Sequence, residues 1–314
     1  MSEGRLRLTI LGGFLGSGKT TWLRHQLHTR AFGRVHVIVN EAADAPVDDA
    51  LLARADQMTL LAGACACCAG QGGLIAALLD ICNRRSGEGD PTTRLEHIVL
   101  ETSGLADPDA ILSLIQGHPI LARQIVVAEI VVIVDTLNGG DQVQQEPLSR
   151  KQIEAADRLI LTKTDAAQPD QVARLRATLA SLAPAAQQSG ALFGSGASLP
   201  DYDVTTTKPY SIAERPDTPI HASQIELGAT ADWTAFTVWL SALLFARGDQ
   251  IVRVKGVVRT PAGRLLVQTV RKSVQSPEIL PESRTEVATD NSIAVIGRGF
   301  TQQQLSASLA QFSA

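Results

Sequence analysis

Short apolar runs alternate with helical patterns over the first two thirds of the chain. The runs are almost continuously apolar, as strands buried on both faces of a sheet are. They are Leu8–Leu11, Val35–Val39, Ile98–Leu100, Ile130–Val134, Leu159–Leu161 and Ala191–Phe193. Between them, apolar residues recur every three or four positions, for example from Leu74 to Cys82 and from Val172 to Leu182. The alternation of strand and helix predicts an α/β fold with a mainly parallel sheet.

The pattern changes near residue 195. Residues 194–219 are rich in Gly, Ser, Thr, Asp and Pro, which is typical of a linker. Beyond them we expect strands over Ile220–Ile225, Ile251–Thr260, Arg264–Lys272 and Ser292–Ile296, and helices over Asp232–Arg247 and Thr301–Phe312. The sequence therefore predicts an α/β domain over residues 1–200, a linker over 201–219 and a smaller α+β domain over 220–314.

Composition limits the classes of function. The chain has 314 residues, of which 45% are hydrophobic and 19% charged, enough apolar material for two cores. The net charge of -4 argues against a nucleic-acid partner, because no basic excess is available to neutralise phosphates. The longest apolar run, Ile125–Val134, is interrupted by Glu129 and is too short to span a bilayer, and we find no secretory signal. We expect a cytoplasmic protein that does not associate with membranes.

A phosphate-binding motif follows the first predicted strand. Residues 13–20, GFLGSGKT, match G-x-x-x-x-G-K-[ST], and a helix is expected from about Thr20. Glycines let backbone N–H groups turn toward phosphates, Lys19 supplies a positive charge, and the Thr20 hydroxyl can ligate Mg²⁺. The candidate nucleotide-binding residues here are Gly13, Gly16, Ser17, Gly18, Lys19, Thr20 and Thr21.

Two further strand ends carry candidate nucleotide chemistry. Glu101 ends an apolar strand and is followed by Gly104, so we expect Glu101 to hold a magnesium-bound water or orient the attacking water, and the Gly104 N–H to contact the γ-phosphate. A capping turn after a strand is the alternative. Thr162, Lys163 and Asp165 form T-K-x-D, in which the Asp carboxylate would accept hydrogen bonds from guanine N1–H and its 2-amino group. Here the alternative is a solvated loop.

Three of the four cysteines lie within four residues. Cys65, Cys67 and Cys68 are flanked by glycines that permit a turn, on which three thiolates could meet at one metal ion. The open fourth position could take water, Glu41 or a ligand from a client protein. Thiolates favour Zn²⁺ or Cu⁺ over Mg²⁺ or Ca²⁺, and Co²⁺ and Ni²⁺ remain open. Small buried residues on a packed turn, or a redox thiol pair, are the alternatives. Cys82 lies on an apolar helix face and is expected in the core.

Together these motifs resemble the CobW-like branch of the metal-handling P-loop GTPases, which also include the UreG and HypB nickel chaperones. The matching segments are GGFLGSGKTT, IVNE, CACC, VLETSGLADP, VVIVD and LTKTD, then VKGVV, LLVQTV and AVIGRGF in the second domain. The resemblance implies slow hydrolysis of GTP to GDP with Mg²⁺, and binding of Zn²⁺ or Co²⁺ for delivery to a client metalloprotein. It also allows a dimer that depends on nucleotide or metal.

The chain departs from the family pattern at two places. Glu41 is followed by Ala42 and Ala43, where the family usually has an aromatic residue and glycine. The segment between the domains has only His221 near its end, so we expect no histidine-rich metal reservoir.

Two other functions remain open at this point. A GTP-regulated metal sensor or scaffold would use partner binding as its output. A P-loop kinase would transfer phosphate to a small molecule, but T-K-x-D and the cysteine cluster count against it. A client protein that gains metal only with GTP would separate a metallochaperone from a sensor.

Overall fold

The computed structural model describes residues 4–41, 57–62, 71–87, 94–203, 205–212, 220–228, 232–270, 272–280 and 291–312. For Glu41, Ala62, Val270 and Ser273 it describes the backbone alone. The chain divides into two compact units, Met1–Arg215 and Pro216–Ala314, each with its own sheet.

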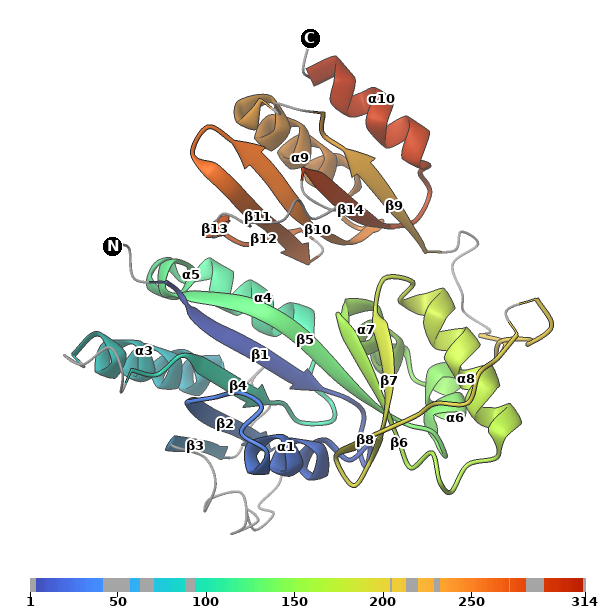
Figure 1. The fold of residues 1–314 in the computed structure, drawn as a ribbon. Helices are drawn as coiled ribbons and strands as arrows, with labels where there is room; N and C mark the ends of the chain where they lie inside the picture. The colour runs from blue at the N-terminus through green and yellow to red at the C-terminus, as the bar shows by residue number, and fades with distance from the viewer. Residues whose placement is uncertain are drawn as a thin grey trace. The chain divides into compact units, whose positions relative to one another are not determined.

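The first unit contains an eight-stranded sheet in the order β3-β2-β4-β1-β5-β6-β7-β8 (Figure 1). Its strands are β1 (Leu6–Gly12), β2 (Val35–Glu41), β3 (Gln57–Ala62), β4 (His97–Glu101), β5 (Ile125–Asp135), β6 (Arg158–Thr162), β7 (Gln187–Leu192) and β8 (Ser195–Ala197). Every neighbouring pair is parallel except β7 and β8. The predicted α/β class is confirmed, and the central strands are almost wholly buried, as the apolar runs indicated.

The helices of this unit are α1 (Lys19–His28), α3 (Gln71–Gly87), α4 (Pro108–Gly117), α5 (Pro119–Gln124), α6 (Gly139–Gln145), α7 (Pro147–Ala155) and α8 (Pro169–Leu182). The Asp107 side chain accepts a hydrogen bond from the Asp109 N–H at 3.0 Å, and Pro108 is the first residue of α4. The Asp-Pro pair favours this start, because a capping carboxylate and a fixed proline φ both stabilise a helix N-terminus.

Part of the expected linker packs on the first unit. The guanidinium of Arg174 lies 4.3 Å from the centre of the Tyr210 ring, and the Tyr210 N–H donates to the Thr178 hydroxyl at 2.8 Å. A Cβ at Gly140 would lie 2.8 Å from the same ring, so only glycine leaves room for it. Tyr210 thus contacts both α6 and α8.

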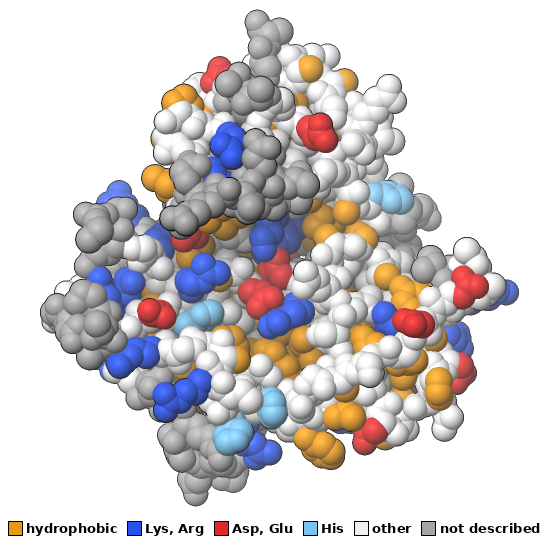
Figure 2. All heavy atoms as spheres, in the orientation of Figure 1, with side chains coloured by type: hydrophobic (Ala, Val, Ile, Leu, Met, Phe, Trp, Pro, Cys, Tyr) orange, Lys and Arg blue, Asp and Glu red, His pale blue; other side chains and the backbone are white. Residues whose placement is uncertain are grey.

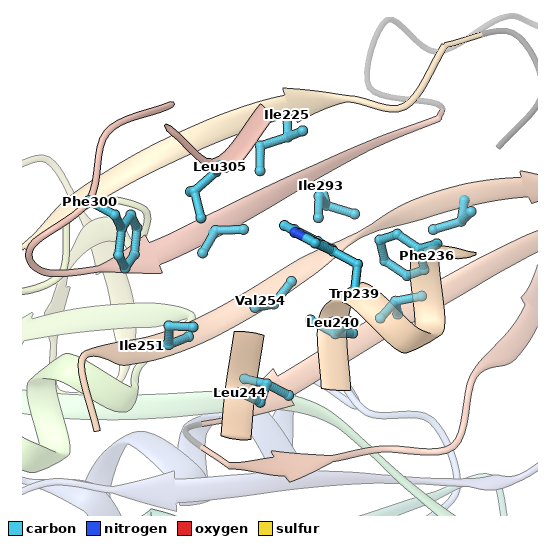
Figure 3. Packing of buried hydrophobic residues seen from close by; sticks show 13 residues of the cluster. Ile225, Phe236, Trp239, Leu240, Leu244, Ile251, Val254, Ile293, Phe300 and Leu305 are labelled. Carbon is cyan, nitrogen blue, oxygen red and sulfur yellow. The ribbon is translucent and has the colours of Figure 1, made fainter. Parts of the chain in front are cut away.

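The second unit is an antiparallel sheet with two helices. Its strands are β9 (His221–Glu226), β10 (Ile251–Thr260), β11 (Gly263–Val270), β12 (Ser273–Val274), β13 (Glu278–Leu280) and β14 (Ser292–Gly297). The order is β12-β11-β10-β14-β9, with β13 also paired to β11. Helices α9 (Trp233–Arg247) and α10 (Gln302–Phe312) supply Phe236, Trp239 and Leu305 to the core shown in Figure 3. The predicted α+β domain is confirmed, and β10 and β11 form an antiparallel hairpin.

The surface has mixed charge. Figure 2 shows Lys and Arg side chains interspersed with Asp and Glu side chains on the visible face. Within the described residues, no helix is both long enough and apolar enough to cross a bilayer.

Candidate functional site

The predicted phosphate motif and Glu101 lie at one edge of the first sheet. β1 and β4 are parallel neighbours, and Leu11 pairs with Glu101 near their carboxyl ends. After β1 the chain crosses to β2 on the far side of β4, whereas after β4 it continues to β5 on the other side of β1. Ligands of open α/β sheets bind where the strand order reverses in this way.

The loop after β1 needs glycine at its first motif position. Gly13 has φ of 137°, and a Cβ there would lie 2.4 Å from the carbonyl oxygen of Ile133 on β5. Gly16 and Gly18 also have positive φ, 73° and 94°. The loop therefore passes tightly over the sheet and turns back to begin α1 at Lys19.

Lys19 and Ser17 are held by backbone contacts. Lys19 Nζ donates to the carbonyl oxygens of Gly13 at 2.9 Å and Phe14 at 3.2 Å, so its charge lies inside the curve of the loop. Ser17 is fully buried, and its carbonyl oxygen accepts a hydrogen bond from Thr162 Oγ1 at 2.7 Å. This bond joins the phosphate loop to the T-K-x-D segment.

Thr20 and Glu101 form an oxygen pair beside the loop. Thr20 Oγ1 donates to Glu101 Oε1 at 2.5 Å, and the Glu101 side chain is buried. Thr102 Oγ1 donates to the Leu11 carbonyl at 3.0 Å, which fixes the end of β4 against β1. A hydroxyl and a carboxylate at this separation are hard oxygen donors that fit Mg²⁺.

Gly104 lies directly against the phosphate loop. A Cβ at this position would lie 2.7 Å from the Leu15 nitrogen, so no other residue fits without displacing the loop. Gln152 Nε2 holds the segment from behind, donating to the carbonyl oxygens of Gly104 at 3.2 Å and Ala106 at 2.8 Å. Sequence reasoning missed Gln152, because nothing local marks its contact with a loop 48 residues away.

These residues surround a pocket of about 370 Å³. Its walls are Leu15, Gly16, Gly18, Lys19, Thr20, Thr21, Val39, Asn40, Glu101, Thr102, Ser103, Gly104 and Leu105. The structure thus brings most of the predicted residues of the phosphate loop together with Glu101 and Gly104 at the end of β4, whereas Gly13 and Ser17 do not line this pocket. It adds Val39 and Asn40 of β2, which sequence reasoning did not place here.

A second pocket, of about 300 Å³, lies at the T-K-x-D segment. Its lining includes Thr162, Lys163 and Asp165 as predicted, and Thr21 and Gly18, which also line the first pocket. Trp22, Ala166, Leu192, Phe193 and Gly194 complete the wall. Two pockets that share residues of the same loop and helix suit the phosphates and the base of one nucleotide.

Asp135 positions Lys163. Lys163 Nζ donates to Asp135 Oδ2 at 2.7 Å and to the Gly16 carbonyl at 3.0 Å. Burial would raise the pKa of Asp135, but hydrogen bonds from Lys163, Asn138 and the Leu137 N–H hold the pKa below its ordinary value. Sequence reasoning assigned Asp135 no part in the site, although a lone carboxylate at the end of an apolar strand was the available signal.

The candidate metal site lies outside the described residues. Cys65, Cys67, Cys68 and the side chain of Glu41 all belong to the part that the structure does not describe. The described residues contain no cluster of three His, Cys, Asp or Glu side chains able to hold a metal ion. Cys82 is buried, and desolvation raises the pKa of its thiol to about 11, which confirms it as a core residue.

The backbone places Glu41 beside the strand that leads to the cysteines. β2 and β3 are parallel, and Glu41 pairs with Ala62, the last residue of β3. Cys65 follows Ala62 by three residues in the sequence.

Known proteins match both units. The model of the CobW/HypB/UreG nucleotide-binding domain matches residues 7–189, and that of the cobalamin synthesis protein CobW C-terminal domain matches residues 220–313. The zinc chaperone YjiA of Escherichia coli is 31% identical over 279 residues, covering 85% of this chain and 86% of YjiA. The zinc chaperone CobW of Sinorhizobium sp. is 27% identical over 316 residues, covering 86% of each chain.

A solved structure agrees with the fold. The crystal structure of Zn(II)-bound YjiA GTPase from E. coli is similar with a TM-score of 0.58 and 22% identity, covering 99% of each chain. The resemblance inferred from the motifs is thereby confirmed over both domains: the chain belongs to the CobW/HypB/UreG family of P-loop GTPases and carries the CobW C-terminal domain.

Proposed function

We propose that this GTPase is a metallochaperone that carries a transition metal, zinc first and cobalt second, on Cys65, Cys67, Cys68 and Glu41. The client is a metalloprotein that lacks its metal. The relatives named zinc chaperones support zinc, and the softness of thiolate ligands agrees with it.

One observation carries the proposal: the strand that lines the phosphate pocket, β2, ends at the proposed metal ligand Glu41. Val39 and Asn40 line the phosphate pocket, and the next residue is Glu41, the end of the strand. Glu41 in turn pairs with the end of β3, from which the chain leads to the cysteines. A small shift of β2 caused by the γ-phosphate would therefore move one metal ligand relative to the others.

In the proposed reaction, the loop after β1 binds the phosphates and Asp165 binds the guanine edge. Lys19 balances the charge on the β- and γ-phosphates, and the Gly104 N–H donates to the γ-phosphate. Thr20 would hold Mg²⁺, and Glu101 would hold a magnesium-bound water or orient the attacking water. When bound, the ion would neutralise charge developing on the phosphate oxygens. Hydrolysis removes the γ-phosphate contact, and the metal ligand set changes.

Replacing Cys65, Cys67 and Cys68 together with Ser should remove the bound transition metal. Serine hydroxyls are poor ligands for soft ions at neutral pH. Metal content per chain, measured by mass spectrometry after purification under reducing conditions, is expected to fall from about one to near zero. Cys82→Ser is the control and should keep the metal, because Cys82 is buried in the core. Unchanged metal content in the triple variant would refute the thiolate site.

A sensor or scaffold remains the second candidate, and the rate of metal release separates the two. Zinc-loaded protein is mixed with a chromophoric chelator in the presence of GTP, a non-hydrolysable GTP analogue or GDP. A metallochaperone should release zinc faster during GTP turnover than with the analogue. Equal release in all three conditions would favour the sensor, whose output would be sought in nucleotide-dependent binding of a partner or of a second copy of the chain.

A further inference from the structure

The turn between β7 and β8 carries a phenylalanine where the backbone favours asparagine or glycine. Leu192 pairs with Ser195, which leaves Phe193 and Gly194 as a two-residue turn. Their φ values are 47° and 90°. Two-residue hairpin turns with both φ values positive prefer Asn-Gly. Phe193 is the aromatic member of the four described non-glycine residues with positive φ, beside Arg30, Lys163 and Asn291.

Packing does not explain the residue either. The Phe193 side chain is 85% exposed, so its ring contributes little to the core. The expectation of a strand through Phe193 was wrong, because β7 ends at Leu192. A bulky residue with positive φ and an exposed ring is strained and gains nothing from the fold, and such outliers cluster at ligand sites.

The turn is fixed to the helix that follows the phosphate loop. A Cβ at Gly194 would lie 2.3 Å from His25 Cβ, so the turn packs closely on α1. Gln26 Nε2, also on α1, donates to the Gly194 carbonyl oxygen at 3.0 Å. Phe193 is therefore held at a constant position relative to the nucleotide pockets.

Phe193 lines the second pocket together with Lys163 and Asp165. Lys163 is tied to Asp135 and to the Gly16 carbonyl, which fixes the course of its alkyl stem. A purine has a polar edge, suited to a carboxylate such as Asp165, and two flat faces suited to an aromatic ring. Phe193 is the one exposed aromatic side chain in the lining of this pocket.

We propose that Phe193 is a base-contacting residue, whose ring covers one face of the guanine that Asp165 recognises. The inference rests on the proposed recognition of guanine by Asp165. The turn between β7 and β8 lies outside the sequence motifs. In this proposal it contributes to the affinity for the nucleoside but not to the affinity for the phosphates.

Backbone-matched variants test this assignment. Phe193→Asn and Phe193→Gly both suit positive φ and so preserve the turn while removing the ring. We expect them to weaken GTP binding roughly 5- to 150-fold, the range found when a stacking side chain is truncated, and to leave binding of magnesium tripolyphosphate, which has no base, unchanged. Phe193→Trp should retain the wild-type GTP affinity. Phe245→Ala is the control, because Phe245 is 92% exposed on α9 and should not affect either ligand.

Asp165→Asn is measured alongside. If Asp165→Asn loses GTP while Phe193→Asn and Phe193→Gly bind it as wild type does, base recognition stands and the Phe193 contact is refuted. Equal weakening of GTP and tripolyphosphate in the Phe193 variants would also overturn the proposal, because the turn would then act through the fold. Loss confined to GTP, with rescue by tryptophan, is the result that supports it.

Discussion

Lys19→Ala is expected to abolish tight nucleotide binding while the protein stays folded. Lys19 Nζ donates to the backbone carbonyl oxygens of Gly13 and Phe14 in its own loop, and its side chain is only half-buried, so its loss removes little from the core. Two charge-assisted bonds to phosphates are together worth about 3–6 kcal/mol, which corresponds to roughly a hundredfold to ten-thousandfold in affinity.

The measurement is equilibrium binding of GTP and GDP, with thermal unfolding of the nucleotide-free protein as the check on folding. Lys151→Ala is the matched control, because Lys151 is an exposed lysine on α7 outside both pockets. If Lys19→Ala still binds GTP within tenfold of the wild type, the phosphate-loop assignment fails.

Asp165→Asn should exchange the preference for GTP for a preference for xanthosine triphosphate. The carboxylate can accept hydrogen bonds from guanine N1–H and its 2-amino group, whereas an amide can donate to the xanthine carbonyl. Loss of two bonds to a charged acceptor corresponds to roughly a hundredfold or more in GTP affinity.

Competition between the two nucleotides, measured for the wild type and the variant, gives the change in selectivity directly. Asp201→Asn removes another exposed carboxylate of the same unit and should leave selectivity unchanged. Identical nucleotide preference in Asp165→Asn and wild type would mean that the base is read elsewhere.

The phosphate loop and the base motif could be located from sequence because their chemistry is local. Gly13, Lys19 and Thr20 lie within eight consecutive residues that follow β1. The strands near them are buried on both faces of the sheet, so they are almost continuously apolar in sequence. Glu101 was found because it ends such a strand, and the pairing of β1 with β4 then brings it to Thr20.

Contacts between distant segments escaped sequence reasoning. Asp135 and Gln152 act on residues 28 and 48 positions away, and no periodic pattern encodes such a contact. β3 was missed because Gln57–Ala62 is a short edge strand that mixes polar and apolar residues. Phe193 was placed in a strand because its apolar side chain concealed the turn that Gly194 makes.

The same limit applies to the metal. Sequence identifies three thiols close together, and the register of β2 and β3 pairs Glu41 with Ala62, three residues before the first of them. The ligands themselves stay a prediction, since they lie outside the described residues.

The central claim is that nucleotide and metal are coupled through β2. Metal affinity should be measured by chelator competition with a non-hydrolysable GTP analogue, with GDP and without nucleotide, and GTP affinity with and without metal. Coupling of about 1–3 kcal/mol would change metal affinity roughly 5- to 150-fold between nucleotide states, and GTP affinity must change by the same factor on adding metal. Metal affinities that are identical in all three nucleotide states would contradict the account, because two independent sites on one chain cannot drive metal transfer.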